Sequence, residues 1–220
     1  MKNVAAEVWR LDERPRPLIN VYLAGDVLID AERTWDRSRI FKQLEGREIS
    51  MLALTHVHAD HQGCADAVCE ARGIPFACHP DDVDAMEGRR PIAATNGLQA
   101  RFYARLWAGP PRKVDRLLEE GDEVGGFRVV HAPGHSPGEV IFFRDSDRVA
   151  ICGDVIRNIT YLSLRARLAA PPDNLTPDPA ENRRSIRKLA ALEPSVILPG
   201  HGPEVTDIEG FRRWVATLPD

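Results

Sequence analysis

Three short histidine motifs, each preceded by an apolar run, constrain this chain more than any other feature of its sequence. Five of the seven histidines fall within them. The motifs span Thr55–His61, Pro133–Ser136 and Pro199–Gly202, and a Cys-Gly-Asp sequence at Cys152–Asp154 lies between the second and the third. A short apolar run of this kind is typical of a buried strand. The pattern therefore predicts a polar site assembled at the ends of several strands.

The side chains of these motifs predict that the site binds two metal ions. Imidazole and carboxylate groups are ligands of zinc, iron and manganese, and each ion needs several of them. His56 and His58 are two residues apart, so they share a face of an extended stretch and can reach one ion. Asp60 and His61 follow as the chain turns toward a helix. The side chains of Asp60 and His61 cannot easily reach the ion that His56 and His58 bind. This indicates a second ion roughly 3.5–4 Å from the first.

Separate loops supply the remaining ligands, and one carboxylate is expected to bridge the ions. Asp154 has two oxygens and suits this bridging position. The two expected ligand sets, which share Asp154, are His56, His58 and His135 for the first ion and Asp60, His61 and His201 for the second. The expected cofactors are two divalent metal ions, zinc in the first place, with iron or manganese as alternatives.

The same motifs resemble those of the metallo-β-lactamase-fold hydrolases, and the resemblance runs from about residue 18 to 205. It is strongest to the branch that holds glyoxalase II-like thioesterases and acyl-homoserine lactonases. It implies an α/β fold, a four-layer αβ/βα sandwich with the metals at one edge between the sheets, and the ligand roles given above. In β-lactamases of this fold a cysteine usually stands where Asp154 stands here. Cys152 lies two residues too early, which weakens an antibiotic-cleaving interpretation.

Length and composition predict one globular domain over residues 1–220, and the resemblance implies that it is a metallo-hydrolase domain. The chain is 43% hydrophobic and 28% charged, with a net charge of −4, so it lacks the basic field of a general nucleic-acid binder. Residues 1–12 contain charges and no long apolar run, so we expect neither a secretory signal nor a membrane span. We therefore expect a cytoplasmic protein whose partner is a small-molecule substrate, without nucleic acid or membrane. The sequence does not predict an oligomeric state.

Hydrophobic periodicity predicts strands that alternate with helices, as in layered α/β folds. The expected strands are Val4–Leu11, Leu18–Ala24, Val27–Asp30, Ser50–Leu54, Ile74–Cys78, Asp122–Val124, Phe127–His131, Val140–Phe143, Val149–Cys152 and Ser195–Leu198. The expected helices are Thr34–Leu44, His61–Arg72, Pro179–Leu192 and Asp207–Leu218.

Two segments, Pro80–Asp115 and Ile156–Pro172, do not fit a plain core and are expected to be lid insertions over the substrate. Both follow strands that end near the metals and contain aromatic residues and arginines. The expected substrate-binding residues among them are Tyr103, Trp107, Arg157 and Tyr161. Arg101 and Arg105 share with Arg157 the chemistry to bind a carboxylate or phosphate. The alternatives are helix packing for the aromatic residues and solvated faces for the arginines.

Three residues outside the motifs receive other interpretations. Asp30 ends a strand where the family often has an aspartate that supports the ligand loop. We therefore expect it to contact a metal-ligating residue on the side away from the metal. His79 and His131 sit in no ligand motif and are interpreted as structural residues.

The predicted activity is hydrolysis of a small ester, thioester or lactone by a metal-bridging hydroxide, with Asp60 as the catalytic residue that orients it. The chain ends 19 residues after His201, so the glutathione-holding region of glyoxalase II is not expected, and Tyr161 lies farther from Asp154 than the usual lactonase tyrosine. Two alternatives stay open. One is a mononuclear iron persulfide dioxygenase-like oxidoreductase, and the other is a metal-retaining domain without catalysis.

Overall fold

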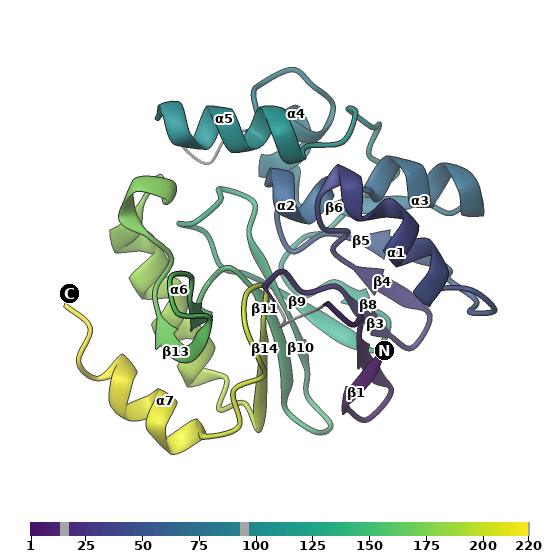
Figure 1. The fold of residues 1–220 in the computed structure, drawn as a ribbon. Coiled ribbons are helices and arrows are strands. Elements are labelled where there is room, and N and C mark those ends of the chain that lie inside the picture. Colours follow the sequence, from purple (N-terminus) through teal and green to yellow (C-terminus); the bar gives the residue numbers. More distant parts are fainter. Residues whose placement is uncertain (14–17, 93–96, 220) are drawn as a thin grey trace.

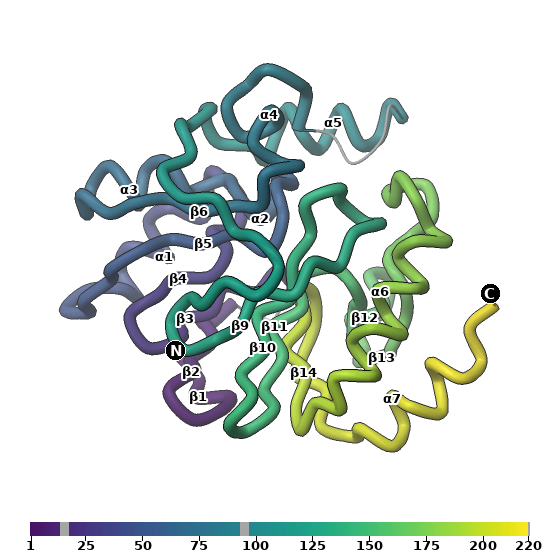
Figure 2. Tube along the Cα trace, turned by 180° about the vertical axis from the view of Figure 1, so that it is seen from behind, coloured from purple at the N-terminus to yellow at the C-terminus, as the bar shows by residue number. Residues whose placement is uncertain are grey.

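The computed structural model of the protein describes residues 1–13, 18–92 and 97–219. It shows two β-sheets packed face to face, with helices on the outer side of each (Figure 1). Figure 2 shows the same arrangement from behind, with α4 and α5 at the opposite end of the molecule from the β1–β2 hairpin. The order of strands in the two sheets decides where the motif residues meet.

The first sheet contains the N-terminal strands in sequence order. Its antiparallel part runs from β1 to β4, and its parallel part from β4 to β7. The strands are β1 Lys2–Ala5, β2 Val8–Arg10, β3 Tyr22–Ala24, β4 Val27–Ile29, β5 Met51–Ala53, β6 Phe76–Cys78 and β7 Arg116–Leu117.

The second sheet has the strand order β14-β11-β10-β9-β8. Strand β10 is antiparallel to β9 and β11, and β14 is parallel to β11, so β9, β11 and β14 all run in one direction. A separate antiparallel pair, β12 with β13, follows β11. These strands are β8 Glu123–Val124, β9 Phe127–His131, β10 Val140–Arg144, β11 Val149–Gly153, β12 Arg157–Thr160, β13 Arg165–Ala169 and β14 Val196–Pro199.

Helices cover both outer faces and one edge. In the described part of the chain, three segments are short 3₁₀ turns: η1 Thr34–Asp36, η2 Pro80–Asp82 and η3 Asp173–Leu175. The α-helices are α1 Arg37–Gln43, α2 Ala59–Gln62, α3 Ala65–Arg72, α4 Val83–Met86, α5 Leu98–Trp107, α6 Pro179–Ala191 and α7 Ile208–Val215. Within the described ranges, no helix combines the length and apolar character needed to cross a bilayer.

Three apolar clusters fill the spaces between the four layers, and this arrangement confirms the predicted αβ/βα sandwich. Side chains alternate along each strand, so neighbouring residues belong to different clusters. Val129 and Phe142 pack between the two sheets, whereas Val130 and Ile141 pack against α6 and α7 together with Phe211. A third cluster lies between the first sheet and the helices α1 and α3.

The expected strand Leu18–Ala24 is a strand only over Tyr22–Ala24, and two further predicted elements differ from the observed ones for local reasons. The expected strand Val4–Leu11 is a hairpin, because the chain turns at Glu7, which has a positive φ of 52°. No glycine or proline marks this turn in the sequence. The expected helix His61–Arg72 is two helices with a break at Gly63. A Cβ atom at Gly63 would lie 2.4 Å from the backbone nitrogen of Thr34, so this close approach needs glycine.

The two expected lid segments also contain regular structure. Pro80–Asp115 holds η2, α4 and α5, and Ile156–Pro172 holds the β12–β13 hairpin. Figures 1 and 2 both show α5 at the edge of the molecule beyond α2. Helices α2 and α5 are in direct contact, which places α5 beside the segment that carries the first histidine motif.

Candidate metal centre

The carboxyl ends of six strands meet at one edge of the sandwich, and each delivers a polar residue there. In the first sheet, β4, β5 and β6 are parallel, so Asp30, the His56 motif and Asp82 follow strand ends on the same side. In the second sheet, β9, β11 and β14 run in one direction and lead to the remaining motifs. The sheets are joined at this edge by a hydrogen bond of 2.8 Å from the Val140 N–H to the Thr55 carbonyl. Ligands distant in sequence therefore converge because of strand direction.

The structure brings all seven predicted ligand residues together. Their donor atoms form three overlapping groups, and within each group the atoms lie within 4.8 Å of one another. The groups are His56, His58 and His135; Asp60, His61 and His201; and His56, His61 and Asp154. The first two groups are the two sets predicted from the sequence, and the third connects them.

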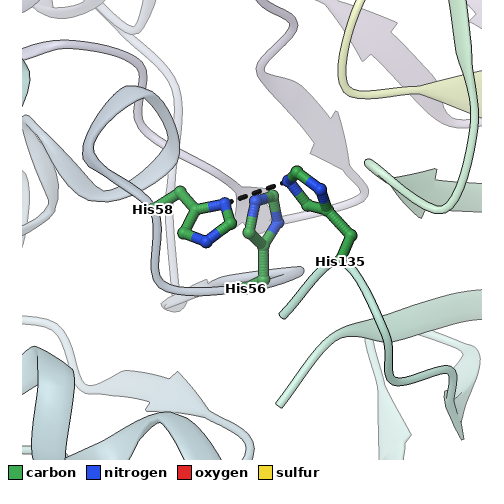
Figure 3. Close-up of side chains that lie close together, drawn as sticks. All are labelled: His56, His58 and His135. Atoms are coloured by element: carbon green, nitrogen blue, oxygen red, sulfur yellow. Dashed lines mark hydrogen bonds between the residues drawn. The ribbon is translucent and has the colours of Figure 1, made fainter. Parts of the chain in front are cut away.

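The first set consists of three imidazole rings that face one another (Figure 3). His58 Nδ1 lies 3.0 Å from His135 Nε2, and the two rings are nearly perpendicular. The His56 ring centre lies 4.5 Å from that of His58 and 5.1 Å from that of His135. Three nitrogen donors at this spacing suit one metal ion of the zinc type.

The second set is linked to the first by the Asp154 carboxylate. His201 Nε2 lies 3.4 Å from an Asp60 oxygen and 3.0 Å from Asp154 Oδ2. The same Asp154 oxygen lies 3.4 Å from His135 Nε2, and its second oxygen lies 3.5 Å from His61 Nε2. Asp154 therefore contacts a histidine of each set, as the bridging role requires.

Buried atoms without partners test whether these residues fit metal ions. His56 Nε2, His61 Nε2 and Asp154 Oδ1 are buried and have no hydrogen-bond partner. A buried polar atom is normally paired, and leaving one unpaired costs about 1–3 kcal/mol. These atoms point into the cluster of donors, where a cation would pair with all of them. The donor set therefore fits divalent metal ions.

In four of the histidines, the Nδ1 atom contacts a supporting residue outside the donor sets. Such contacts fix the ring orientation and the tautomer of a metal-binding histidine. The pairs are His56 Nδ1 with Thr55 Oγ1 at 3.1 Å, His61 Nδ1 with Asp30 Oδ2 at 2.9 Å, His135 Nδ1 with Thr176 Oγ1 at 3.3 Å, and His201 Nδ1 with the Leu18 carbonyl at 2.5 Å. Asp30 thus occupies the supporting position expected for it, and it also accepts a hydrogen bond from the Thr55 N–H.

The whole arrangement matches a known family. The model of the metallo-beta-lactamase superfamily matches residues 15–201 of the chain, a range that includes every predicted ligand. The chain belongs to the metallo-β-lactamase superfamily. Its members use divalent metals, in agreement with the donor sets described above.

Individual metallo-β-lactamase superfamily proteins resemble this chain over most of its length. A probable metallo-hydrolase of Bacillus subtilis (strain 168), YflN, is 31% identical over 190 residues, which cover 79% of this chain and 72% of that protein. The structure of TTHA1623 in a di-iron-bound form is 31% identical and has a TM-score of 0.70, covering 92% of this chain and 96% of that one. The B3 metallo-β-lactamase BLEG-1 is 28% identical with a TM-score of 0.65, covering 90% and 93%.

Electrostatics differ between the two sets of this superfamily site. Burial and the neighbouring imidazoles lower the pKa of His135 to about 3 and hold that of His56 well below its usual range. Burial opposes protonation of His61 as well, but the Asp154 and Asp30 carboxylates raise its pKa to about 9. Burial would raise the pKa of Asp60, yet the His201 hydrogen bond and the charges of His61 and His201 keep it well below its usual range. The first set is therefore neutral, and the second pairs carboxylates with protonated rings in the absence of metal.

Glycine is required where the last motif passes the bridging carboxylate. A Cβ atom at Gly200 would lie 2.3 Å from Asp154 Oδ1 and 2.8 Å from His61 Cε1. The Gly200 N–H also donates to the Gly153 carbonyl at 2.6 Å, which ties two ligand loops together. This close approach explains the glycine that precedes His201.

A cavity of about 440 Å³ lies next to the donor sets, and some of the predicted substrate-binding residues line it. Tyr103, Trp107 and Tyr161 line it. Arg157 does not, because its guanidinium turns away and donates to the carbonyls of Ala170 and Ile159. Arg101 and Arg105 are exposed on α5 and also do not line the cavity. None of these three arginines therefore lines the cavity in this structure.

His79 and His131 form a further polar group with Asp81, away from this cavity. Their rings stack with centres 3.9 Å apart and almost parallel planes. His79 Nδ1 accepts from the Asp81 N–H, and His131 Nε2 donates to the Pro137 carbonyl at 2.9 Å. Both nitrogens next to Asp81 are therefore occupied, which agrees with the structural role expected for this pair.

Two buried carboxyl groups of the site were not predicted. Glu139 accepts from the Asp154 N–H at 2.6 Å, and burial together with the Asp154 charge raises its pKa well above the usual range. Asp82 accepts from the Val57 N–H at 2.9 Å and from the Ser136 hydroxyl at 2.8 and 2.9 Å. Asp82 follows the apolar strand β6, so it carries the same strand-end signal as the motif residues.

We expect Asp82→Ala to destabilise the site strongly, because Asp82 ties the His56–His58 loop to the His135 loop. The loss leaves buried donors unpaired, so the free energy of unfolding of the metal-free protein should fall by about 3 kcal/mol. Urea unfolding and competition with a chelator measure the stability and the metal affinity. The neighbouring Asp81→Ala, whose side chain is 56% exposed, is the control and should change neither quantity appreciably. Equal behaviour of both variants would show that Asp82 does not organise the site.

Proposed function

We propose that the protein is a binuclear metal-dependent hydrolase of a small ester, thioester or lactone. The observation that supports this most is the pair of donor sets that share Asp154 at the floor of one cavity. The expected metals are zinc, iron or manganese, as the nitrogen and carboxylate donors favour. We propose the ligand roles predicted from the sequence for all seven residues.

Water is the attacking group in this proposal, because the described lining of the cavity offers no serine, cysteine or lysine nucleophile. The Ser136 hydroxyl lies nearby but donates to Asp82. Divalent ions bound by the two sets would lower the pKa of water and polarise the substrate carbonyl.

Asp60 is the residue that we propose to orient this water. Its carboxylate lines the cavity and is partly exposed, whereas His61 beside it is fully buried. Helix α2 holds Asp60 at its first turn, next to His58. A carboxylate in this position accepts a hydrogen bond from the water and can take its proton as the carbonyl is attacked.

The second donor set distinguishes this proposal from a mononuclear iron oxygenase. A mononuclear site does not need Asp60, His61 and His201 in one group. The donor atoms of these residues nevertheless lie within 4.8 Å of one another, as those of the first set do. His61 and His201 are also held from behind by Asp30 and the Leu18 carbonyl. These contacts, which orient the two imidazole rings, support a second metal rather than three unused polar residues.

A panel of acyl thioesters, aryl esters, lactones and one β-lactam tests the proposed activity. The protein is loaded with zinc, iron or manganese in turn, and kcat/KM is measured for each substrate. We expect turnover of at least one carbonyl ester or thioester, and its loss when a chelator removes the metal. Metal-loaded protein that hydrolyses no member of the panel, but oxidises a persulfide, would overturn the proposal.

A further inference from the structure

The cavity above the metal centre has walls that are mostly apolar, although its floor is polar. Aromatic and aliphatic side chains come from the N-terminal loop, from α5 and its approach, and from the segments after β11. Those side chains are Leu18, Ile19, Ile92, Tyr103, Trp107, Tyr161 and Leu175. Apolar walls of this kind bind an apolar group by removing its surface from water.

The aromatic wall on α5 is built by stacking. The Tyr103 and Trp107 rings are parallel, with centres 4.3 Å apart, and the Trp107 ring meets Trp35 edge to face at 6.4 Å. Both side chains are half-buried and line the cavity. Phe102 also lies on α5, but its side chain is 58% exposed and does not line the cavity.

Three neutral polar side chains of the wall, Gln99, Tyr103 and Asn174, are hydrogen-bonded to one another. Gln99 donates to the Tyr103 hydroxyl at 3.3 Å and accepts from the Asn174 amide at 3.1 Å. This chain of hydrogen bonds joins α5 to η3 along the cavity. A ligand gains little from these groups, because their partners would have to be replaced.

The charge of Arg33 on the cavity wall is already paired. Apart from the donor sets, Arg33 is the one charged residue among the described side chains that line the cavity. Its Nε donates to Asp36 at 2.7 Å, and its terminal nitrogen lies 3.3 Å from a Glu13 oxygen. The other Glu13 oxygen accepts from the Leu18 and Ile19 N–H groups, so Glu13 is fixed in place. Two carboxylates therefore surround this guanidinium, and it offers no free positive charge to a ligand.

From this we infer the substrate class: the part of the substrate held in the cavity is an uncharged apolar acyl or aryl group, and a second anionic group there is selected against. The inference rests on the proposed hydrolase function and adds the chemistry of the acyl side. An anion held against the described side chains of these walls, away from the donor sets, would lose its hydration without gaining a cationic partner from them, which is unfavourable. The inference replaces the earlier expectation that arginines of the lid segments bind an anionic part of the substrate.

A matched pair of non-hydrolysable ketones tests this inference without requiring turnover. Hexyl methyl ketone is compared with the same ketone in which a sulfonate replaces the terminal methyl group, and calorimetry on the metal-loaded protein gives both dissociation constants. We expect the sulfonate to bind at least about tenfold more weakly. We expect Trp107→Ala to weaken binding of the neutral ketone about tenfold, and Phe102→Ala, the control on the outer side of α5, to leave it within about twofold.

Two outcomes overturn the inference. One is binding of the sulfonate as tight as that of the neutral ketone, and the other is a neutral ketone that binds equally to Trp107→Ala and Phe102→Ala. Metal content and far-ultraviolet circular dichroism verify that the variants keep the fold and the centre. If the neutral ketone binds as expected but no ester of the panel is hydrolysed, the proposed function fails while the binding preference stands.

Discussion

Asp60→Asn is expected to reduce kcat by at least about 10²–10⁴-fold while leaving the fold intact. Asparagine keeps the size of the side chain but removes the negative charge that accepts a proton. Asp60 also lies 3.4 Å from His201 in the second donor set, so the substitution would also weaken the binding of a metal ion held by that set. Both effects act at the same atoms, which is why this change should be among the most damaging in the chain.

The measurement is kcat on the best substrate of the panel, with metal content determined on the same sample. Asp66→Asn provides the control, since Asp66 lies on α3 and pairs with Arg112 rather than with the centre. The control should retain full activity. Turnover by Asp60→Asn within a few-fold of the original protein, with its metal retained, would show that the assigned role is wrong.

Asp154→Ala is expected to lower the metal content from two ions per chain to one or fewer and to abolish activity. Its carboxylate lies between the two sets, 3.0 Å from His201 and 3.4 Å from His135. Alanine removes both oxygens at once, so each ion loses a ligand. Plasma emission spectrometry after metal loading and desalting measures the content.

Cys152→Ser is the matched control for this experiment. Cys152 lies two residues before Asp154, is fully buried in the cluster between the second sheet and α6, and is not in any of the donor groups. The metal content of the Cys152→Ser variant should equal that of the original chain. Loss of metal in Cys152→Ser but not in Asp154→Ala would assign the ligand role to the thiol instead.

The convergence of the candidate ligands could be predicted from the sequence because each signal is local. An apolar strand followed directly by a histidine or aspartate motif identifies a residue at a strand end, and parallel strands bring such ends together. The hairpin at Glu7 was not predicted because it has no local sequence signal. The backbone there has a positive φ of 52° without glycine or proline.

Asp30 was predicted as a supporting residue from its place at a strand end. The contacts of Asp82 and Glu139 were not predicted, because their partners are far away in the sequence. Asp82 binds Val57 and Ser136, which are 25 and 54 residues distant, and no spacing rule connects them. The pairing of Arg33 with Glu13 decides the charge of the cavity and is likewise a tertiary contact. The direction of Arg157, away from the cavity, depends on the β12–β13 hairpin that binds its guanidinium to Ala170.

Anomalous diffraction from crystals of the metal-loaded protein tests the central claim most directly, because it locates each ion among its ligands. We expect two separate peaks per chain. One should lie among His56, His58 and His135, the other among Asp60, His61 and His201, with Asp154 in contact with both. A single peak in fully loaded protein, with the second donor set still paired internally through Asp60 and His201, would contradict the binuclear centre.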